Sequence, residues 1–220
     1  MTSPCLVLVH GWGFDADFWS PLATALKDIE TRIVDLGFFG KPHDVDPPAD
    51  RPLIAIGHSL GLLWLLKNRP FAWQGLVSIS GMPRFLRSDD FPHGIAPRFL
   101  ERMKSRFNED PLLTLNEFRS RCGWADDPVS PAAIDTARLA QGLDWLSDWD
   151  VRESLKNESA PVLALAGDND SIIPWALSAS VFADRPLSEL HCAKGGSHVL
   201  PYAQPQWCAD HIRNFLARAA

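Results

Sequence analysis

Short runs of apolar residues recur along the chain, and each is about as long as a β-strand. They lie at residues 5–9, 33–35, 53–57, 76–80, 162–166 and 188–192. Most are continuous rather than alternating, which is typical of parallel strands buried on both faces of a sheet. Segments with helical spacing lie between them, at residues 18–26, 60–68, 175–182 and 207–217. The pattern predicts an α/β fold with a mostly parallel sheet covered by helices.

The strand pattern stops in the middle of the chain. Between residues 82 and 155 helical periodicity takes over, with helices predicted at 97–107, 112–122 and 131–146. A helical insertion that follows a strand is typical of a lid over a substrate pocket. We therefore predict a core formed by residues 1–81 and 156–220, and a helical lid formed by residues 82–155.

Two further features concern the edges of the sheet. The chain begins four residues before its first predicted strand, so we expect no antiparallel N-terminal hairpin. Residues 36–52 show no helical spacing and contain Pro42, Pro47, Pro48 and Pro52, which predicts an irregular crossover. The edge of the sheet beside this crossover is then expected to be open, and a partner subunit could cover it. The sequence leaves the choice between monomer and oligomer open.

Composition narrows the class of protein. With 220 residues, of which 46% are hydrophobic, the chain is long enough for one well-buried domain with an insertion. It has no apolar run of about 20 residues and no signal-peptide pattern, so a cytoplasmic protein without a membrane segment is expected. The net charge of −6 argues against nucleic-acid binding. Four scattered cysteines predict neither a metal site nor disulfides, and no cofactor is expected.

The sequence Gly57-His58-Ser59-Leu60-Gly61 carries the clearest chemical signal. It follows an apolar run and opens a helical segment, so it predicts a strand, a sharp turn and a helix. In such a turn the serine hydroxyl is lifted above the sheet, and the flanking glycines avoid collisions. The motif therefore predicts Ser59 as a nucleophile.

A serine nucleophile needs a general base and a carboxylate that orients the base. His198 lies in a glycine-rich segment, residues 194–201, after the last predicted strand. Asp170 lies in the loop that follows the strand at 162–166, where the acid of such a triad belongs, and Asp168 is the alternative. The chain order is serine, aspartate, histidine.

The oxyanion of the reaction intermediate needs hydrogen-bond donors. His10-Gly11-Trp12-Gly13 follows the first predicted strand, and its glycines allow the backbone N–H of Trp12 to approach the oxyanion. The N–H of Leu60, directly after the nucleophile, is the second predicted donor. His10 and His58 are predicted to hold these loops rather than to react.

These segments together resemble the α/β-hydrolase family over nearly the whole chain. The resemblance implies an α/β-hydrolase fold, a triad of Ser59, Asp170 and His198, and an oxyanion hole formed by Trp12 and Leu60.

Within that family the chain bears a closer resemblance to the pimeloyl-acyl-carrier-protein methyl ester esterases of biotin synthesis. The supporting stretches are residues 8–13, 34–40, 91–95 and 142–152. On this likeness Phe118 contacts the pimeloyl chain. The chain departs from these esterases at His58 and Leu62, where tryptophan and glycine are usual. It also departs at Leu113 and Glu117, where two of the lid arginines that engage the carrier protein are expected.

The predicted lid nevertheless concentrates positive charge. Residues 98–121 carry a net charge of +2, against −8 for the remainder of the chain. Their basic residues are Arg98, Arg102, Lys104, Arg106, Arg119 and Arg121. This asymmetry favours docking of an acidic carrier protein, and the alternative is an ordinary solvated helix face.

The substrate pocket is expected to be aromatic. Trp12, Phe118 and Trp145 are predicted to contact substrate. Aromatic residues in the helical segments fit an apolar tunnel for a medium acyl chain and, at least as well, ordinary core positions: Trp64, Phe107, Phe118, Trp124, Trp145 and Trp149.

The sequence thus predicts a serine carboxylesterase that acts through an acyl-enzyme, with a pimeloyl-carrier methyl ester as the favoured substrate. A general carboxylesterase or thioesterase, or a C–C bond hydrolase of small acyl substrates, would use the same triad. A ligand receptor that kept the fold without catalysis is a more remote alternative.

Overall fold

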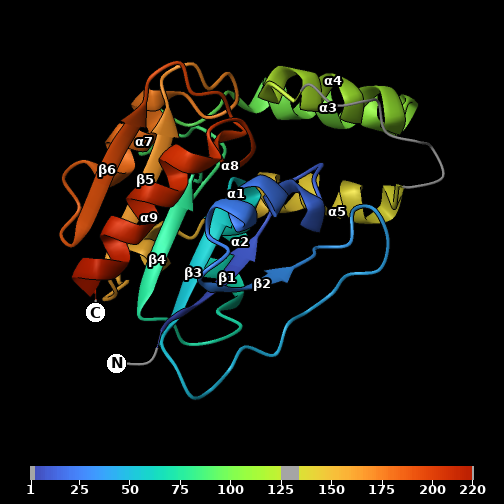
Figure 1. Cartoon of the computed structure of the whole chain (residues 1–220). Helices are drawn as coiled ribbons and strands as arrows, with labels where there is room; N and C mark the ends of the chain where they lie inside the picture. Colours follow the sequence, from blue (N-terminus) through green and yellow to red (C-terminus); the bar gives the residue numbers. More distant parts are fainter. Residues whose placement is uncertain (1–2, 125–133, 220) are drawn as a thin grey trace.

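A single six-stranded sheet forms the centre of the molecule. The computed structural model describes residues 3–124 and 134–219, and Figure 1 shows its course. All strand pairs in this sheet are parallel, and the strand order is β2-β1-β3-β4-β5-β6. The strands are β1 (Cys5–Val9), β2 (Glu30–Val34), β3 (Leu53–His58), β4 (Gly75–Ile79), β5 (Val162–Gly167) and β6 (Ser188–Ala193). The predicted α/β class with a mostly parallel sheet is confirmed.

Helices cover both faces of the sheet. The short η1 (Ala16–Trp19) leads into α1 (Ser20–Ala25), which packs against α9 (Pro205–Ala219) and α8 (Leu200–Ala203) on one face. On the opposite face α2 (Leu60–Asn68) packs on β3 and contacts α6 (Arg152–Lys156). Helix α7 (Trp175–Phe182) packs on β5 and β6. Because β1, β3, β4 and β5 are covered on both sides, every residue in these strands is buried.

The edge strand β2 differs most from its prediction. It begins at Glu30, three residues before the apolar run at 33–35, and ends at Val34. Only its last residue is buried, because the strand has a neighbour on one side alone. A half-covered strand tolerates polar residues such as Glu30 and Arg32, so a search for continuous apolar residues misses its start.

The crossover from β2 to β3 is irregular, as its prolines predict. No helix lies between these strands. The loop first turns back on β2, because the N–H groups of Asp35 and His43 each donate to the other residue's carbonyl oxygen at 2.9 Å. Val45 then packs against the core. The chain itself therefore borders part of the edge that the sequence predicted to be open.

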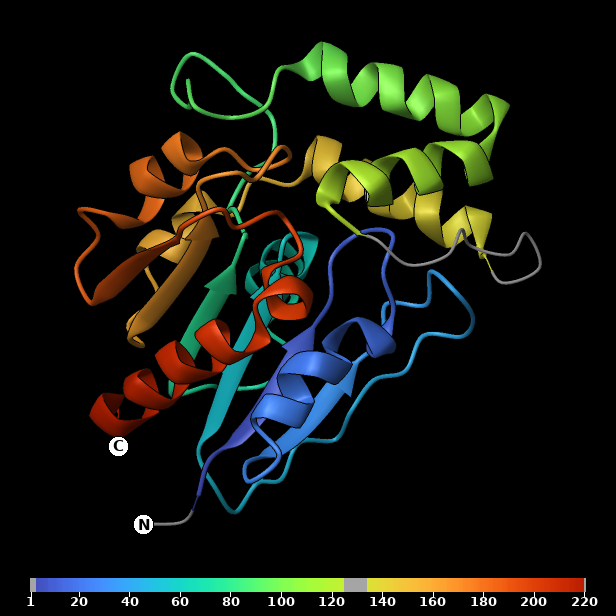
Figure 2. The same ribbon diagram turned by 45° about the horizontal axis from the view of Figure 1, so that its top comes forward.

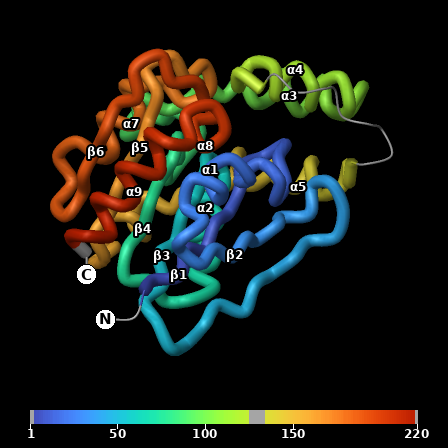
Figure 3. Tube along the Cα trace, viewed as in Figure 1, coloured from blue at the N-terminus to red at the C-terminus, as the bar shows by residue number. Residues whose placement is uncertain are grey.

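Residues 82–124 and 134–155 form a helical excursion beyond the carboxyl ends of the strands, as Figure 2 shows. It contains α3 (Pro97–Glu109), α4 (Pro111–Cys122) and α5 (Thr136–Asp148), and α3 contacts both other helices. The two ends of the excursion meet, because the Val151 N–H donates to the Pro83 carbonyl oxygen at 2.8 Å. The tube in Figure 3 follows this out-and-back path.

The third helix of this segment was predicted at residues 131–146. Its predicted start, residues 131–133, lies outside the described residues. The described helix begins at Thr136, where the Asp135 carboxylate caps it by accepting a hydrogen bond from the Arg138 N–H. None of the described helices has the length and apolar character needed to cross a membrane.

Candidate active site

The turn between β3 and α2 holds Ser59 in a strained conformation. Its φ and ψ angles are 51° and −120°, in a region that side-chain-bearing residues rarely adopt. The Ser59 N–H donates to the Ile79 carbonyl oxygen of β4 at 3.0 Å, which ties the turn to the sheet. This conformation places Ser59 at the carboxyl edge of the sheet, as the motif predicts.

Glycines make the turn possible through close backbone approaches. A Cβ at Gly57 would lie 2.5 Å from the backbone of Leu62 in α2. A Cβ at Gly61 would collide with the carbonyl oxygen of Val9, so α2 and β1 pack closer than any side chain allows. The close packing of the turn against α2 and β1 therefore requires glycine at both positions.

The structure brings the three predicted triad residues into one hydrogen-bonded chain. The Ser59 Oγ lies 3.0 Å from His198 Nε2, and His198 Nδ1 lies 2.8 Å from the Asp170 Oδ2. Ser59, Asp170 and His198 are 6%, 7% and 1% exposed. Since a carboxylate only accepts hydrogen bonds, Nδ1 carries the proton and Nε2 is left to accept from the serine hydroxyl. This is the arrangement of a nucleophile, a base and an orienting acid.

Asp170 is held as an anion by its surroundings. Burial opposes ionisation, but the charge interaction and hydrogen bond with His198 outweigh it. The backbone N–H groups of Ile172 and Ile173 both donate to Asp170 Oδ1 at 2.8 Å. Together these contacts lower the pKa of the Asp170 carboxyl below its ordinary value.

The alternative acid, Asp168, has a different position. It is exposed, and its Oδ1 accepts a hydrogen bond from the Gly195 N–H at 2.6 Å. Asp168 therefore braces the loop that carries His198, whereas Asp170 contacts the histidine ring.

A second buried histidine supports the loop after β1. His10 Nδ1 donates to the Gly11 carbonyl oxygen at 2.9 Å, and its Nε2 accepts from the Leu36 N–H at 3.0 Å. The Gly11 carbonyl and the Trp12 N–H belong to one planar peptide group and point in opposite directions. Holding the carbonyl toward His10 therefore directs the Trp12 N–H away from it.

Gly11 itself lies against the nucleophile. A Cβ there would come within 2.9 Å of the Ser59 Cβ. Leu60 opens α2, and the first N–H groups of a helix have no partner within the helix. The N–H groups of Trp12 and Leu60 thus stay the candidate oxyanion donors.

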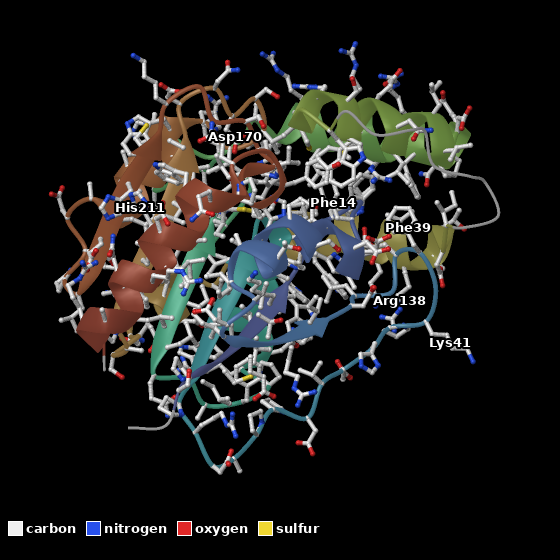
Figure 4. The ribbon with its side chains drawn as sticks, viewed as in Figure 1. Phe14, Phe39, Lys41, Arg138, Asp170 and His211 are labelled. Carbon is white, nitrogen blue, oxygen red and sulfur yellow. The ribbon has the colours of Figure 1, made fainter. Side chains whose placement is uncertain are left out.

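The helical segment packs directly on this site. The Trp12 Nε1–H donates to the Leu139 carbonyl oxygen of α5 at 2.7 Å. The Phe118 ring of α4 lies 4.9 Å from the Trp12 ring and 6.5 Å from the His198 ring, measured between centroids. Phe118 therefore lies beside the candidate base, and its contact with a substrate stays a prediction. In Figure 4 Asp170 lies at the carboxyl end of the sheet, with Phe14 below the level of α4.

Sequence reasoning missed a link between α4 and the triad loops. The Ser171 hydroxyl, next to Asp170, donates to the Arg121 carbonyl oxygen at 2.7 Å. Gly123, which ends α4 with φ of +88°, would place a Cβ 2.9 Å from the Ser197 Oγ. The only sequence signal for this contact is a glycine after a helix, which usually indicates nothing more than a helix end.

The predicted aromatic residues occupy several different places. Phe107 packs against Trp12, with centroids 6.0 Å apart, and Trp124 stacks near Tyr202 at 4.2 Å. Trp145 and Trp149 stack on each other at 4.9 Å, and none of the contacts known for the described residues joins Trp145 to the triad. Trp12 and Phe118 lie at the site, whereas Trp145 has no known contact with it among the described residues, and substrate contact by each of the three stays a prediction.

A cleft of about 180 Å³ opens between α3 and α4. Phe99, Met103 and Phe118 provide its apolar lining, and Phe118 also faces the triad. Its polar lining comes from Arg102, Arg106, Thr114, Glu117 and Arg121. Arg106 pairs with Glu117 at 2.7 Å, and the Arg121 guanidinium lies over the Phe99 ring. The cleft thus combines exposed arginines with the buried side chains of Met103 and Phe118.

Metal-ligating side chains are not gathered anywhere in the described part of the chain. Within residues 3–124 and 134–219, no group of three His, Cys, Asp or Glu side chains is arranged to hold a metal ion.

The family model and the curated relatives that match this chain point to the same class of protein. Residues 6–211 match the alpha/beta hydrolase family. A pimeloyl-[acyl-carrier protein] methyl ester esterase of Legionella pneumophila is 34% identical over 77% of this chain and 77% of its own length. The biotin biosynthesis bifunctional protein BioHC of Cellvibrio japonicus is 30% identical over 98% of this chain, which spans about half, 48%, of that protein.

Solved structures show the same fold at lower identity. A bromoperoxidase from Bacillus anthracis superposes with a TM-score of 0.81 at 22% identity, covering 98% of this chain and 92% of the other. An esterase from Exiguobacterium antarcticum gives a TM-score of 0.80 at 17% identity, with the same coverage.

Proposed function

Because the chain belongs to the alpha/beta hydrolase family, we propose that it is a serine carboxylesterase whose substrate is a pimeloyl methyl ester carried on an acyl carrier protein. The observation that carries the chemistry is the hydrogen-bonded chain from Ser59 through His198 to Asp170. The substrate follows from the named relatives, several of which are pimeloyl-carrier methyl ester esterases.

The first half of the reaction forms an acyl-enzyme. The Ser59 Oγ attacks the ester carbonyl carbon while His198 Nε2 takes the hydroxyl proton. The carbonyl oxygen becomes an oxyanion, which accepts hydrogen bonds from the Trp12 and Leu60 N–H groups. Asp170 stabilises the imidazolium that forms. When the intermediate collapses, His198 returns the proton to the leaving alkoxide, and methanol departs from a methyl ester.

The second half releases the acid. A water molecule gives a proton to His198 Nε2 and attacks the acyl carbonyl. The second tetrahedral intermediate then expels the Ser59 oxygen, which recovers its proton from His198. The products are a free carboxylate and the regenerated serine.

The cleft between α3 and α4 supports a carrier-bound substrate. Its buried lining residue Phe118 lies beside the triad, whereas its lining residues Arg102 and Arg121 are exposed, where a negatively charged carrier would dock. Arg106 is already paired with Glu117. Arg102 and Arg121 are therefore the cleft residues proposed to meet the carrier.

Substrate comparison tests this proposal. We expect methyl pimeloyl-acyl-carrier protein to be cleaved with a kcat/KM at least about tenfold higher than a free methyl ester of the same acid, because docking adds binding energy. The measurement is kcat/KM for both esters, beside short p-nitrophenyl esters and an acyl thioester. Cleavage of small esters alone would favour a general carboxylesterase, and preferential thioester cleavage a thioesterase.

Removing the two proposed docking charges gives a second test. The double variant Arg102→Gln and Arg121→Gln should raise KM for the carrier-bound ester by roughly tenfold, because each exposed ion pair contributes up to about 1 kcal/mol. Small p-nitrophenyl esters should be hydrolysed as before, since neither arginine contacts the triad. Arg218→Gln on α9, where Arg218 pairs with Glu189, is the matched control. An equal effect on both substrate classes would argue against carrier docking.

A further inference from the structure

His58 is a buried ionisable residue that the proposed mechanism does not use. It is the last residue of β3, directly before the nucleophile, and its exposed fraction is 0%. A buried imidazole needs hydrogen-bond partners or a reason to lack them. Its position directly before Ser59 places it within the candidate site.

One edge of the ring binds the loop of the catalytic base. His58 Nε2 lies 2.9 Å from the carbonyl oxygen of His198. A carbonyl only accepts hydrogen bonds, so Nε2 carries the proton and donates it. The contact is made to the main chain of the residue whose side chain takes the Ser59 proton. Any shift of this carbonyl moves the His198 ring with respect to both Ser59 and Asp170.

The other edge of the ring faces the oxyanion loop. A Cβ at Gly11 would lie 2.8 Å from His58 Nδ1, so the loop backbone packs directly against this nitrogen. Among the described residues Nδ1 has no hydrogen-bond partner. A proton on Nδ1 would find no acceptor there, and burial together with nearby His198 lowers the pKa of His58 well below its ordinary value. The ring is therefore held neutral.

Aromatic packing fixes the ring between these two loops. The Phe18 ring lies 4.4 Å from the His58 ring at an angle of 30°, and the Trp19 ring meets it edge-on at 6.3 Å. The His198 ring lies 5.0 Å away. A ring clamped in this way cannot rotate to offer Nδ1 to another group without breaking the bond to the His198 carbonyl.

We propose that His58 is a positioning residue that spans the histidine loop and the oxyanion loop, and that its Nε2–H sets the place of His198 for proton transfer from Ser59. This role rests on the proposed esterase function. Through His58, the end of β3 then positions both the His198 loop and the Gly11-Trp12 peptide relative to Ser59, which directly follows the same strand.

Three substitutions at His58 distinguish the effect of losing the hydrogen-bond donor from the effect of changing the packing of the ring. In His58→Gln the amide N–H reaches about as far from the backbone as Nε2, so the bond to the His198 carbonyl can persist. In His58→Asn the amide reaches only about as far as Nδ1. In His58→Phe a ring of similar shape still packs on Phe18 but offers no donor.

The test compares hydrolysis of a p-nitrophenyl ester by these variants, with kcat normalised to the serines titrated by a fluorophosphonate. We expect His58→Phe and His58→Asn to lose roughly ten- to a hundredfold in kcat with little change in KM, because a small misplacement of a base has an effect of this size. His58→Gln should stay within about threefold of wild type, because it keeps the donor. Equal kcat for all variants, or equal loss in Gln and Asn, would overturn the proposal.

A spectroscopic readout needs no substrate and so is independent of the proposed function. The proton between His198 and Asp170 gives a low-field NMR resonance, which should weaken or shift in His58→Phe and persist in His58→Gln. An unchanged resonance in His58→Phe would count against positioning, whereas failure of the esterase function would show as an inactive wild type. His211→Phe is the matched control, because His211 also bonds a carbonyl, that of Trp207, but lies on α9 apart from Asp170 (Figure 4).

Discussion

Replacing Ser59 with alanine is expected to lower kcat for ester hydrolysis by about 10⁴- to 10⁶-fold, because no acyl-enzyme can form. The Ser59 Oγ is the group that lies 3.0 Å from His198 Nε2, and the alanine leaves His198 without a hydroxyl to activate. The rate of p-nitrophenyl ester hydrolysis by purified wild type and Ser59→Ala measures the effect.

Two controls separate lost chemistry from lost structure. Ser59→Ala should keep a melting temperature near that of wild type, because the substitution removes one side-chain atom and leaves the turn's backbone bond to Ile79 in place. Ser180→Ala removes a hydroxyl that donates to the Leu177 carbonyl oxygen in α7 and should retain full activity. A fluorophosphonate should label wild type and Ser180→Ala but not Ser59→Ala. Hydrolysis retained by Ser59→Ala would end the proposed mechanism.

The residues of the candidate triad were predictable because of how parallel sheets are built. Ser59, Asp170 and His198 each follow a predicted strand in the sequence. The carboxyl ends of parallel strands meet at one edge of the sheet, so residues more than a hundred positions apart come together there. The structure places all three within one hydrogen-bonded chain. Sequence order and strand assignment were therefore enough to bring them together, and their roles stay proposals until measured.

The central strands were predictable for a related reason. Strands such as β1 and β3 are buried on both faces, so their sequences are continuously apolar. The edge strand β2 has mixed burial, and its start at Glu30 left no such signal. Strands that are buried on both faces were thus easier to predict from the sequence than the partly exposed edge strand.

The sequence predicted a loop-holding role for His58, but the partners of contacts between loops were beyond prediction. The hydrogen bond from His58 to the His198 carbonyl, and that from Ser171 to the Arg121 carbonyl, depend on where loop backbones lie after folding. A carbonyl oxygen occurs at every residue, so sequence does not indicate which one a side chain will meet. The same holds for Trp145, whose helical spacing fitted a pocket or an ordinary core position, and which stacks on Trp149.

The second large effect is expected from Asp170→Asn, which should lower kcat by about 10⁴-fold. The asparagine amide keeps the size of the carboxylate but presents either a neutral oxygen or an N–H group to His198 Nδ1. An N–H group facing Nδ1 favours the tautomer with the proton on Nε2, which cannot accept the Ser59 proton. The loss should appear in kcat with little change in KM for a p-nitrophenyl ester.

The same substitution should change how stability depends on pH. The pKa of Asp170 is lowered in the folded protein, so its ionised form stabilises the fold above the unfolded-state pKa, about 3.9. This contribution is lost as the pH falls through the lower, folded-state pKa. The gap in melting temperature between wild type and Asp170→Asn should therefore be widest near neutral pH and should narrow below about pH 4.

Asp168→Asn is the matched control and decides between the two candidate acids. Asp168 lies two residues away on the same loop, is exposed, and contacts the Gly195 N–H rather than the His198 ring. Its amide oxygen can still accept that hydrogen bond, so kcat should fall by no more than about threefold. If Asp168→Asn abolished hydrolysis while Asp170→Asn did not, the orienting carboxylate would be Asp168, and the arrangement around His198 would have to change during turnover. The opposite result, a large loss at Asp170 alone, follows from the hydrogen bond that Asp170, and not Asp168, makes to the ring of the base.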